Sequence, residues 1–315
     1  MTNPSADDAR PATAGRASAP ESNEPPQTHE TQEPQATAAG DQVGAQDANG
    51  SQPLLRLVDV GKNFGPVRAL SGITLDIPPG QVTAIVGDNG AGKSTLIKTI
   101  SGIWAPDHGE IFWRGRAVRL HSPKDATDLG IATVYQDLAL ADNLDIVQNM
   151  FLGRELMKFW QLDEISMEKA AKQTLADLKV VSVRSIRQPV GSLSGGQRQS
   201  VAVAKAVLRQ AQMVILDEPT AALGVTQTRN VLELIGRLAS QGIGVILISH
   251  NLNDVFAVAD QVAVLRLGYL VATGPKSRFD SESIVDLMTT GTSKRLAALA
   301  AEPASSSHQG SPSEH

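Results

Sequence analysis

The chain has 315 residues, of which 41% are hydrophobic and 19% charged, the balance of an ordinary globular protein. The absence of cysteine excludes disulfides and cysteine-bound metals, and the net charge of −5 argues against nucleic acid as the main ligand. The sequence has neither a run of about eighteen apolar residues nor a secretory signal, so we expect any contact with a membrane to run through a partner.

The two ends of the chain differ in composition from the rest. The first fifty residues carry eight acidic side chains against two arginines and hold almost no large apolar side chain. Such a segment cannot bury enough surface to offset the entropy of ordering it. We therefore predict a disordered acidic tail over residues 1–52, a folded part over 53–292 and a disordered tail over 293–315.

Short apolar or β-branched runs predict strands along the folded part, and several of them suit burial on both faces. The predicted strands are Leu54–Val60, Val82–Val86, Ile131–Tyr135, Met213–Leu216, Gly244–Ile248 and Val262–Leu265. Helical stretches separate them, most clearly at Ser194–Arg209 and Thr226–Gln241. This alternation implies an α/β domain with a largely parallel sheet. Strand signals vanish between about Leu138 and Ser192, which predicts an inserted helical subdomain at about 138–200.

A glycine-rich loop follows the predicted strand Val82–Val86 and fits the pattern G-x-x-x-x-G-K-[ST]. Its backbone N–H groups can form a nest for phosphates, and the next helix directs its positive dipole end at the anion. Lys93 is expected to reach the β- and γ-phosphates, and Ser94 to supply a hydroxyl to Mg²⁺. The alternative is a chance match in a glycine turn. The predicted phosphate-binding residues are Gly87, Asp88, Asn89, Gly90, Ala91, Gly92, Lys93, Ser94 and Thr95.

Two carboxylates, Asp217 and Glu218, end the predicted strand that begins at Met213. Alone, they favour a solvated acidic turn at the end of a strand. Beside a phosphate loop they favour catalysis, because an Asp in this place holds Mg²⁺ in P-loop enzymes. Glu218 would then act as the general base on an attacking water.

The segment Leu193-Ser194-Gly195-Gly196-Gln197 opens a predicted helix. Ser194 is a plausible N-cap, and the simplest interpretation is only a helix start with a flexible lead. The segment is also a second anion-binding helix terminus, whereas one nucleotide needs only one. We infer that Ser194, Gly195, Gly196 and Gln197 contact a nucleotide held by another subunit, so that two chains close head to tail over two ATP molecules.

The order of these motifs resembles the nucleotide-binding domain of ABC transporters. The series consists of the phosphate loop at Gly87, Gln136, LSGGQ at Leu193, the Asp217 strand and His250, and it extends over essentially the whole folded part. The resemblance implies an α/β fold, with a P-loop NTPase core of ABC type, an inserted helical subdomain and a small antiparallel β portion.

The resemblance also implies roles for residues whose function could not be predicted from the residue type and position alone. Phe64 resembles the aromatic that stacks on adenine, although a core aromatic is the alternative. Gln136 resembles the glutamine that touches Mg²⁺ and the attacking water, and His250 resembles the histidine that contacts the γ-phosphate, although a histidine at a strand end is often structural. The implied catalytic residues are Glu218, His250, Lys93 and Gln136, and the implied metal ligands are Ser94, Gln136 and Asp217.

One position departs from the family pattern. The family usually has an aspartate shortly after the Asp-Glu strand, in a loop that crosses the dimer interface. This chain has Gly224 there, in the segment Ala221–Val225. The departure puts in doubt how tightly two ATP sites would communicate, and does not bear on whether ATP binds.

Three segments, His121–Asp137, Asn149–Glu155 and Ala221–Val225, resemble ATPase subunits of ribose, xylose and fructose importers. The resemblance implies ATP and Mg²⁺ as cofactors and a homodimer bound to separate permease subunits at the cytoplasmic face of the inner membrane. It implies an indirect partner in a sugar-binding protein, and no nucleic acid.

Other functions remain open at this point. The chain is compatible with an ABC importer for a solute other than a sugar. A non-transport ABC ATPase of DNA repair would carry a long coiled coil between Lys93 and Ser194, and a translation factor would carry two such domains in one chain. A binding module without hydrolysis is disfavoured by the presence of Lys93, Asp217, Glu218 and His250.

Overall fold

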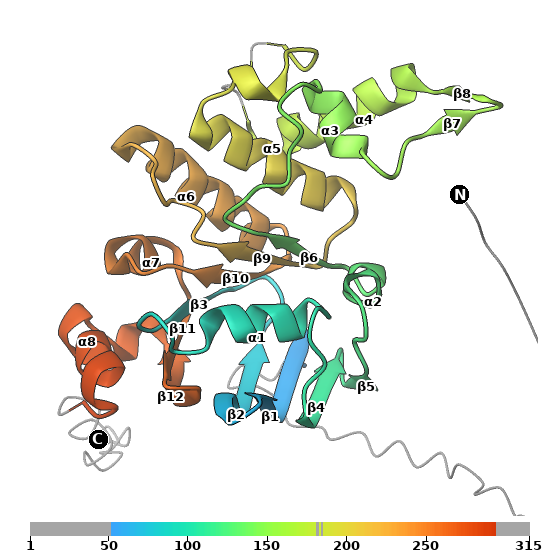
Figure 1. The fold of residues 1–315 in the computed structure, drawn as a ribbon. Coiled ribbons are helices and arrows are strands. Elements are labelled where there is room, and N and C mark those ends of the chain that lie inside the picture. The colour runs from blue at the N-terminus through green and yellow to red at the C-terminus, as the bar shows by residue number, and fades with distance from the viewer. Residues whose placement is uncertain (1–51, 181–182, 184, 294–315) are drawn as a thin grey trace, which may run out of the picture. The chain divides into compact units, whose positions relative to one another are not determined.

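Two β-sheets organise the part of the chain that the computed structural model describes, residues 52–180, 183 and 185–293 (Figure 1). The two predicted tails lie almost wholly outside these residues, so their disorder stays a prediction. No helix in the described ranges is both long and apolar enough to cross a membrane.

The larger sheet has six strands in the order β12-β11-β3-β10-β9-β6. Its neighbours run parallel except for β12, which pairs antiparallel with β11. The strands are β3 (Val82–Val86), β6 (Ile131–Val134), β9 (Met213–Asp217), β10 (Gly244–Ile248), β11 (Gln261–Arg266) and β12 (Tyr269–Pro275). The prediction of a largely parallel sheet is confirmed.

The smaller sheet is antiparallel and has the order β2-β1-β4-β5. Its strands are β1 (Leu55–Phe64), β2 (Val67–Ile77), β4 (His108–Trp113) and β5 (Arg116–Val118). It is the antiparallel portion that the resemblance implied. Helix α1 (Lys93–Ile100) shares a hydrophobic cluster with both sheets, to which it contributes Leu96, Ile97 and Ile100 (Figure 1).

Alternation along the buried strands sends successive side chains to opposite faces of the six-stranded sheet. Met213 and Ile215 join the cluster that contains α1, whereas Val214 and Leu216 join a second cluster on the other face. That other face is covered by α5 (Gly195–Leu208), α6 (Val225–Ser240), α7 (Leu252–Val258) and α8 (Ser281–Thr290). Burial on both faces explains why these strands are continuously apolar.

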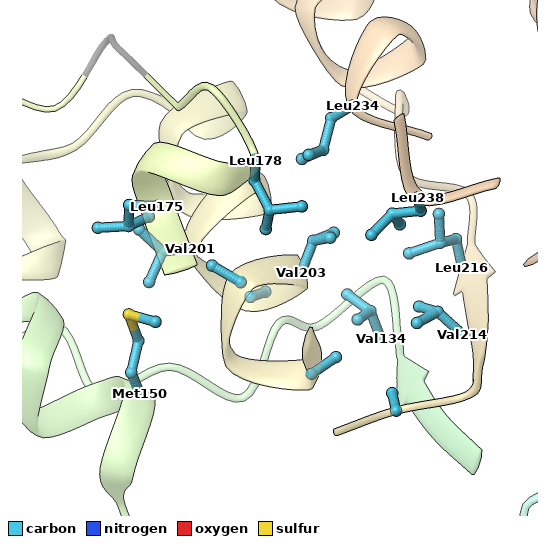
Figure 2. Packing of buried hydrophobic residues seen from close by; sticks show 14 of the residues in the cluster. Val134, Met150, Leu175, Leu178, Val201, Val203, Val214, Leu216, Leu234 and Leu238 are labelled. Carbon is cyan, nitrogen blue, oxygen red and sulfur yellow. The ribbon is translucent and has the colours of Figure 1, made fainter. Parts of the chain in front are cut away.

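Helical residues dominate the stretch after β6, as predicted. It contains α3 (Ile146–Phe151), α4 (Glu164–Asp177), the 3₁₀ turn Val190–Ser192 and α5. Figure 2 shows Met150, Leu175 and Leu178 beside Val201 and Val203 of α5, and they belong to one cluster with side chains of β6, β9 and α6. This shared cluster means that the helical part is packed onto the sheet through α5.

Several elements were not predicted. The expectation that strands vanish after Leu138 is wrong in one place, where β7 (Met157–Lys158) and β8 (Gln161–Leu162) form a short hairpin. Two residues per strand are too few for a period-two pattern to show. The strands β2, β4, β5 and β12 were also not predicted, nor were the helical segments α2 (Pro123–Asp128), α7, α8 and the 3₁₀ turn Lys276–Arg278.

Candidate functional site

Four neighbouring strands of the large sheet deliver the predicted residues to one edge. The glycine loop follows β3, His250 follows β10, Glu218 follows β9 and Gln136 follows β6, in the spatial order of the sheet. The register aligns Ile248 of β10 with Asp217 of β9. Ligands of open α/β sheets bind outside the carboxyl ends of the strands, which is where these residues lie.

The glycine loop has a backbone that other residues would not adopt. Gly90 and Gly92 have φ values of 81° and 106°, in the region that favours glycine. A Cβ on Gly92 would lie 2.7 Å from the carbonyl oxygen of Ala69, and a Cβ on Gly87 would lie 2.4 Å from that of Leu265. Gly92 is also the N-cap of α1. The loop therefore brings backbone N–H groups and a helix N-terminus to one concave surface.

Lys93 bends back over this loop. Its ammonium donates to the carbonyl oxygens of Gly87 at 2.6 Å and Asp88 at 2.9 Å. Burial lowers the pKa of Lys93, and the Glu218, Asp88 and Asp217 carboxylates oppose that shift. The lysine is thus held at the mouth of the nest, within the influence of these three carboxylates.

The two carboxylates at the end of β9, Asp217 and Glu218, are in different environments. Burial and the neighbouring Glu218 raise the pKa of Asp217, while Lys93 and Lys98 act in the opposite direction. Glu218 has a φ of 50°, in the left-handed region, and its N–H donates to the carbonyl of Ile248 at 3.0 Å. Its Oε2 lies 2.7 Å from Nδ1 of His250, whose side chain is 71% exposed.

These residues line one open cleft of about 460 Å³, which is within the usual range of ligand sites. The structure brings together Gln136, Asp217, Glu218 and His250 with the loop residues Asp88–Thr95. It adds residues that sequence reasoning missed, namely Val67, Arg68, Ala69, Ala221 and Ile248. The first three belong to β2, a strand whose pattern had not been identified, so nothing in the sequence analysis pointed to them.

The residues proposed for Mg²⁺ fit that ion by their donor chemistry. Ser94, Gln136 and Asp217 all line the cleft and offer a hydroxyl, an amide oxygen and a carboxylate. Mg²⁺ prefers such oxygen ligands and is commonly held by one or two carboxylates together with substrate phosphates.

Ser194, Gly195, Gly196 and Gln197 are not among the residues that line this cleft. Ser194 is the N-cap of α5, as predicted, and it exchanges hydrogen bonds with Gln197 in a capping box. A Cβ on Gly195 would meet Leu223 Cδ2 at 2.8 Å, so packing within the chain also favours a glycine there. Ser194 itself is exposed at the surface.

Phe64 is also not among the residues that line the cleft, although Val67, its partner in the pairing of β1 with β2, is one of them. It ends β1, its side chain is 40% exposed, and its ring makes an edge-to-face contact with Trp104 at a centroid distance of 4.6 Å. The Lys62 ammonium lies 5.7 Å from the same ring. Phe64 is thus a surface aromatic fixed by a neighbour, and the alternative of a buried core residue is wrong.

Comparison with known proteins places this site in context. The family profile described as ABC transporter matches residues 70–221. A xylose/arabinose import ATP-binding protein of Sulfolobus acidocaldarius is 46% identical over 237 residues, which cover 75% of this chain and 94% of that protein. A fructose import ATP-binding protein of Rhizobium meliloti is 46% identical over 241 residues, covering 74% of this chain and 93% of that protein.

A solved structure shows the same fold. An ATP-binding cassette of an ABC transporter, in its ADP conformation, superposes with a TM-score of 0.66 at 27% identity. The match covers 80% of this chain and 100% of that one.

Proposed function

Because this chain belongs to the ABC transporter family, we propose that it is the ATP-binding and ATP-hydrolysing subunit that energises import of a monosaccharide through a separate permease. The observation that carries the proposal is that Lys93, Asp217, Glu218 and His250 line one cleft together with the glycine loop. A nest with one lysine recognises phosphates, and the adjacent acid pair supplies what hydrolysis requires in addition to binding.

Different groups of the chain have different roles in the proposed reaction. Backbone N–H groups of residues 88–94 and the ammonium of Lys93 bind and orient the β- and γ-phosphates. Glu218 accepts a proton from the water that attacks the γ-phosphate. His250, hydrogen-bonded to Glu218, orients that carboxylate and reaches the transferring phosphate. Phe64 provides a face on which adenine stacks.

Ser94, Gln136 and Asp217 would hold Mg²⁺, which supplies positive charge to the phosphate oxygens when bound. Gln136 links this role to the helical part, because it lies in the segment that leads from β6 toward α3. A movement of the helical part would therefore shift a side chain at the metal site.

The active unit in this proposal is a homodimer. The exposed N-terminus of α5, with Ser194 as its cap, provides an anion-binding surface outside the chain's own cleft. A second copy can present its nucleotide to this surface, so that each ATP lies between the phosphate loop of one chain and Ser194–Gln197 of the other.

Sugar as the transported solute is supported by the names of the relatives, one a xylose/arabinose and the other a fructose import protein. The permease would place the chain at the cytoplasmic face of the membrane as a peripheral subunit. A sugar-binding protein would be an indirect partner on the opposite side.

Two measurements test the proposal. Purified chain incubated with ATP and Mg²⁺ is expected to release phosphate, and to stop when EDTA is added; no release under any ionic condition would contradict the enzyme assignment. Tagged chain purified from detergent-solubilised membranes is expected to carry a multi-span permease. Recovery with DNA in place of a permease would favour a repair ATPase.

A further inference from the structure

A buried hydrogen bond joins Thr220 to Asp254. The Thr220 hydroxyl donates to Oδ2 of Asp254 at 2.6 Å, and the two residues are 9% and 5% exposed. A hydroxyl that donates to a buried carboxylate makes one of the stronger hydrogen bonds in proteins. Asp254 lies in the first turn of α7, where the helix dipole favours its negative charge.

Thr220 belongs to a strained loop that begins at the proposed base. Glu218 and Ala222 have φ values of 50° and 60°, a region that is strained for residues other than glycine. Two backbone bonds stabilise the turn, from Ala221 N–H to Glu218 and from Leu223 N–H to Thr220. Strained backbone of this kind persists only where its surroundings hold it in place.

Asp254 is tied to the other catalytic candidate. Its N–H donates to the carbonyl of Asn251, the residue after His250, and the Asn251 side chain caps α7. Ser249, on the other side of His250, accepts from the N–H of Asn251 at 3.0 Å. The turn that carries His250 is therefore fixed to the same helix that holds Asp254.

These contacts close a ring. Glu218 contacts His250 directly, and the chain continues from His250 into α7. Asp254 of α7 accepts the hydrogen bond from Thr220, which lies in the same loop as Glu218. We propose that Asp254 is a positioning residue for hydrolysis, which acts through Thr220 to set the Glu218 carboxylate against His250. The proposal rests on the proposed role of Glu218 as the base.

The first test removes the hydroxyl of Thr220 while keeping the shape of the side chain. In Thr220→Val we expect kcat per nucleotide-binding site to fall by roughly ten- to a hundredfold, because small displacements of a catalytic group have effects of that size. KM for ATP is expected to stay within about twofold, since the phosphate loop is untouched. Thr220→Ser, which keeps the hydroxyl, is expected to restore most of kcat.

The matched control is Thr174→Val in α4. Thr174 is also 9% exposed, and its hydroxyl donates to the carbonyl of Ala170, in the same helix and away from the cleft. We expect its kcat to equal that of the wild type. An unchanged kcat in Thr220→Val, or an equal loss in Thr174→Val, would overturn the proposal.

Hydrogen exchange supplies a readout that does not depend on turnover or on Thr220→Val folding. Asp254→Asn keeps an acceptor and removes the charge, so we expect faster exchange at the amides of Ala221 and Leu223 and a lower kcat. Unchanged exchange at both amides would overturn the positioning role. Turnover of the wild type tests the proposed function separately, so the two failures are distinguishable.

Discussion

Nδ1 of His250 and Oε2 of Glu218 lie 2.7 Å apart, across the carboxyl ends of β10 and β9. The pairing depends on the parallel register that aligns Ile248 with Asp217, which places the residues that follow them side by side. The side chain of Glu218 is only 17% exposed, whereas that of His250 is 71% exposed. The carboxylate of Glu218 is therefore shielded from solvent, whereas the imidazole beside it is exposed.

Glu218→Gln is expected to lower kcat by about a thousandfold, in the range that loss of a general base produces. ATP affinity should persist, because the phosphate loop and Lys93 are unchanged. Phosphate release and binding of a fluorescent ATP analogue measure the two quantities. Glu233→Gln, at an exposed position of α6, is the control and should behave as the wild type. A Glu218→Gln variant that turns over near the wild-type rate would refute the base assignment.

Lys93→Ala removes the ammonium that lies over the nest. A hydrogen bond to a charged group contributes about 1.5–3 kcal/mol, so we expect ATP to bind roughly ten- to a hundredfold more weakly. Titration calorimetry measures the change. Lys172→Ala, which removes an exposed lysine paired with Glu168, should leave the affinity unchanged. Equal affinities for ATP in the wild type and Lys93→Ala would contradict the phosphate role of this lysine.

Ser194→Arg places a long cation at the exposed cap of α5. We expect it to block approach of a second chain's nucleotide, so that turnover is lost while ATP still binds the isolated chain. Ser240→Arg, at the exposed end of α6, serves as the control. If Ser194→Arg hydrolyses ATP as fast as Ser240→Arg does, the surface has no part in the reaction.

Leu178→Ala tests the packing of the helical part onto the sheet. Leu178 is fully buried in the cluster that includes strands β6 and β9, so its truncation should cost about 2–5 kcal/mol of unfolding free energy (Figure 2). Ile165→Ala, at a position of α4 that is 84% exposed, should change stability by less than about 0.5 kcal/mol. Urea unfolding followed by circular dichroism compares them, and similar midpoints would show that the cluster does not support the fold.

Strands buried on both faces were the easiest to predict. Val82–Val86 and Gly244–Ile248 have the predicted bounds, because a short run of mostly apolar and β-branched residues indicates a strand that is buried on both faces. The cap at Ser194 was also predicted, since a serine that opens a helical run is a local signal. The phosphate loop and His250 could be predicted to lie in one cleft because each comes shortly after one of these strands.

The unpredicted features depend on contacts that sequence patterns do not carry. Strand β2 is half exposed, and its pairing with β1 has irregular register around Gly72, which breaks the expected alternation. The Thr220–Asp254 bond joins residues 34 positions apart and exists only because α7 packs beside the loop after β9. Neither residue belongs to a motif that the sequence analysis used.

The proposed ATP-bound homodimer is tested most directly by the mass of Glu218→Gln in solution with and without ATP and Mg²⁺. In sedimentation velocity we predict a monomer without nucleotide and a dimer with it, because ATP that is bound and not hydrolysed should hold two chains together. The double variant Glu218→Gln/Ser194→Arg should remain monomeric under both conditions. A Glu218→Gln variant that stays monomeric at saturating ATP, or a double variant that dimerises equally well, would contradict the account.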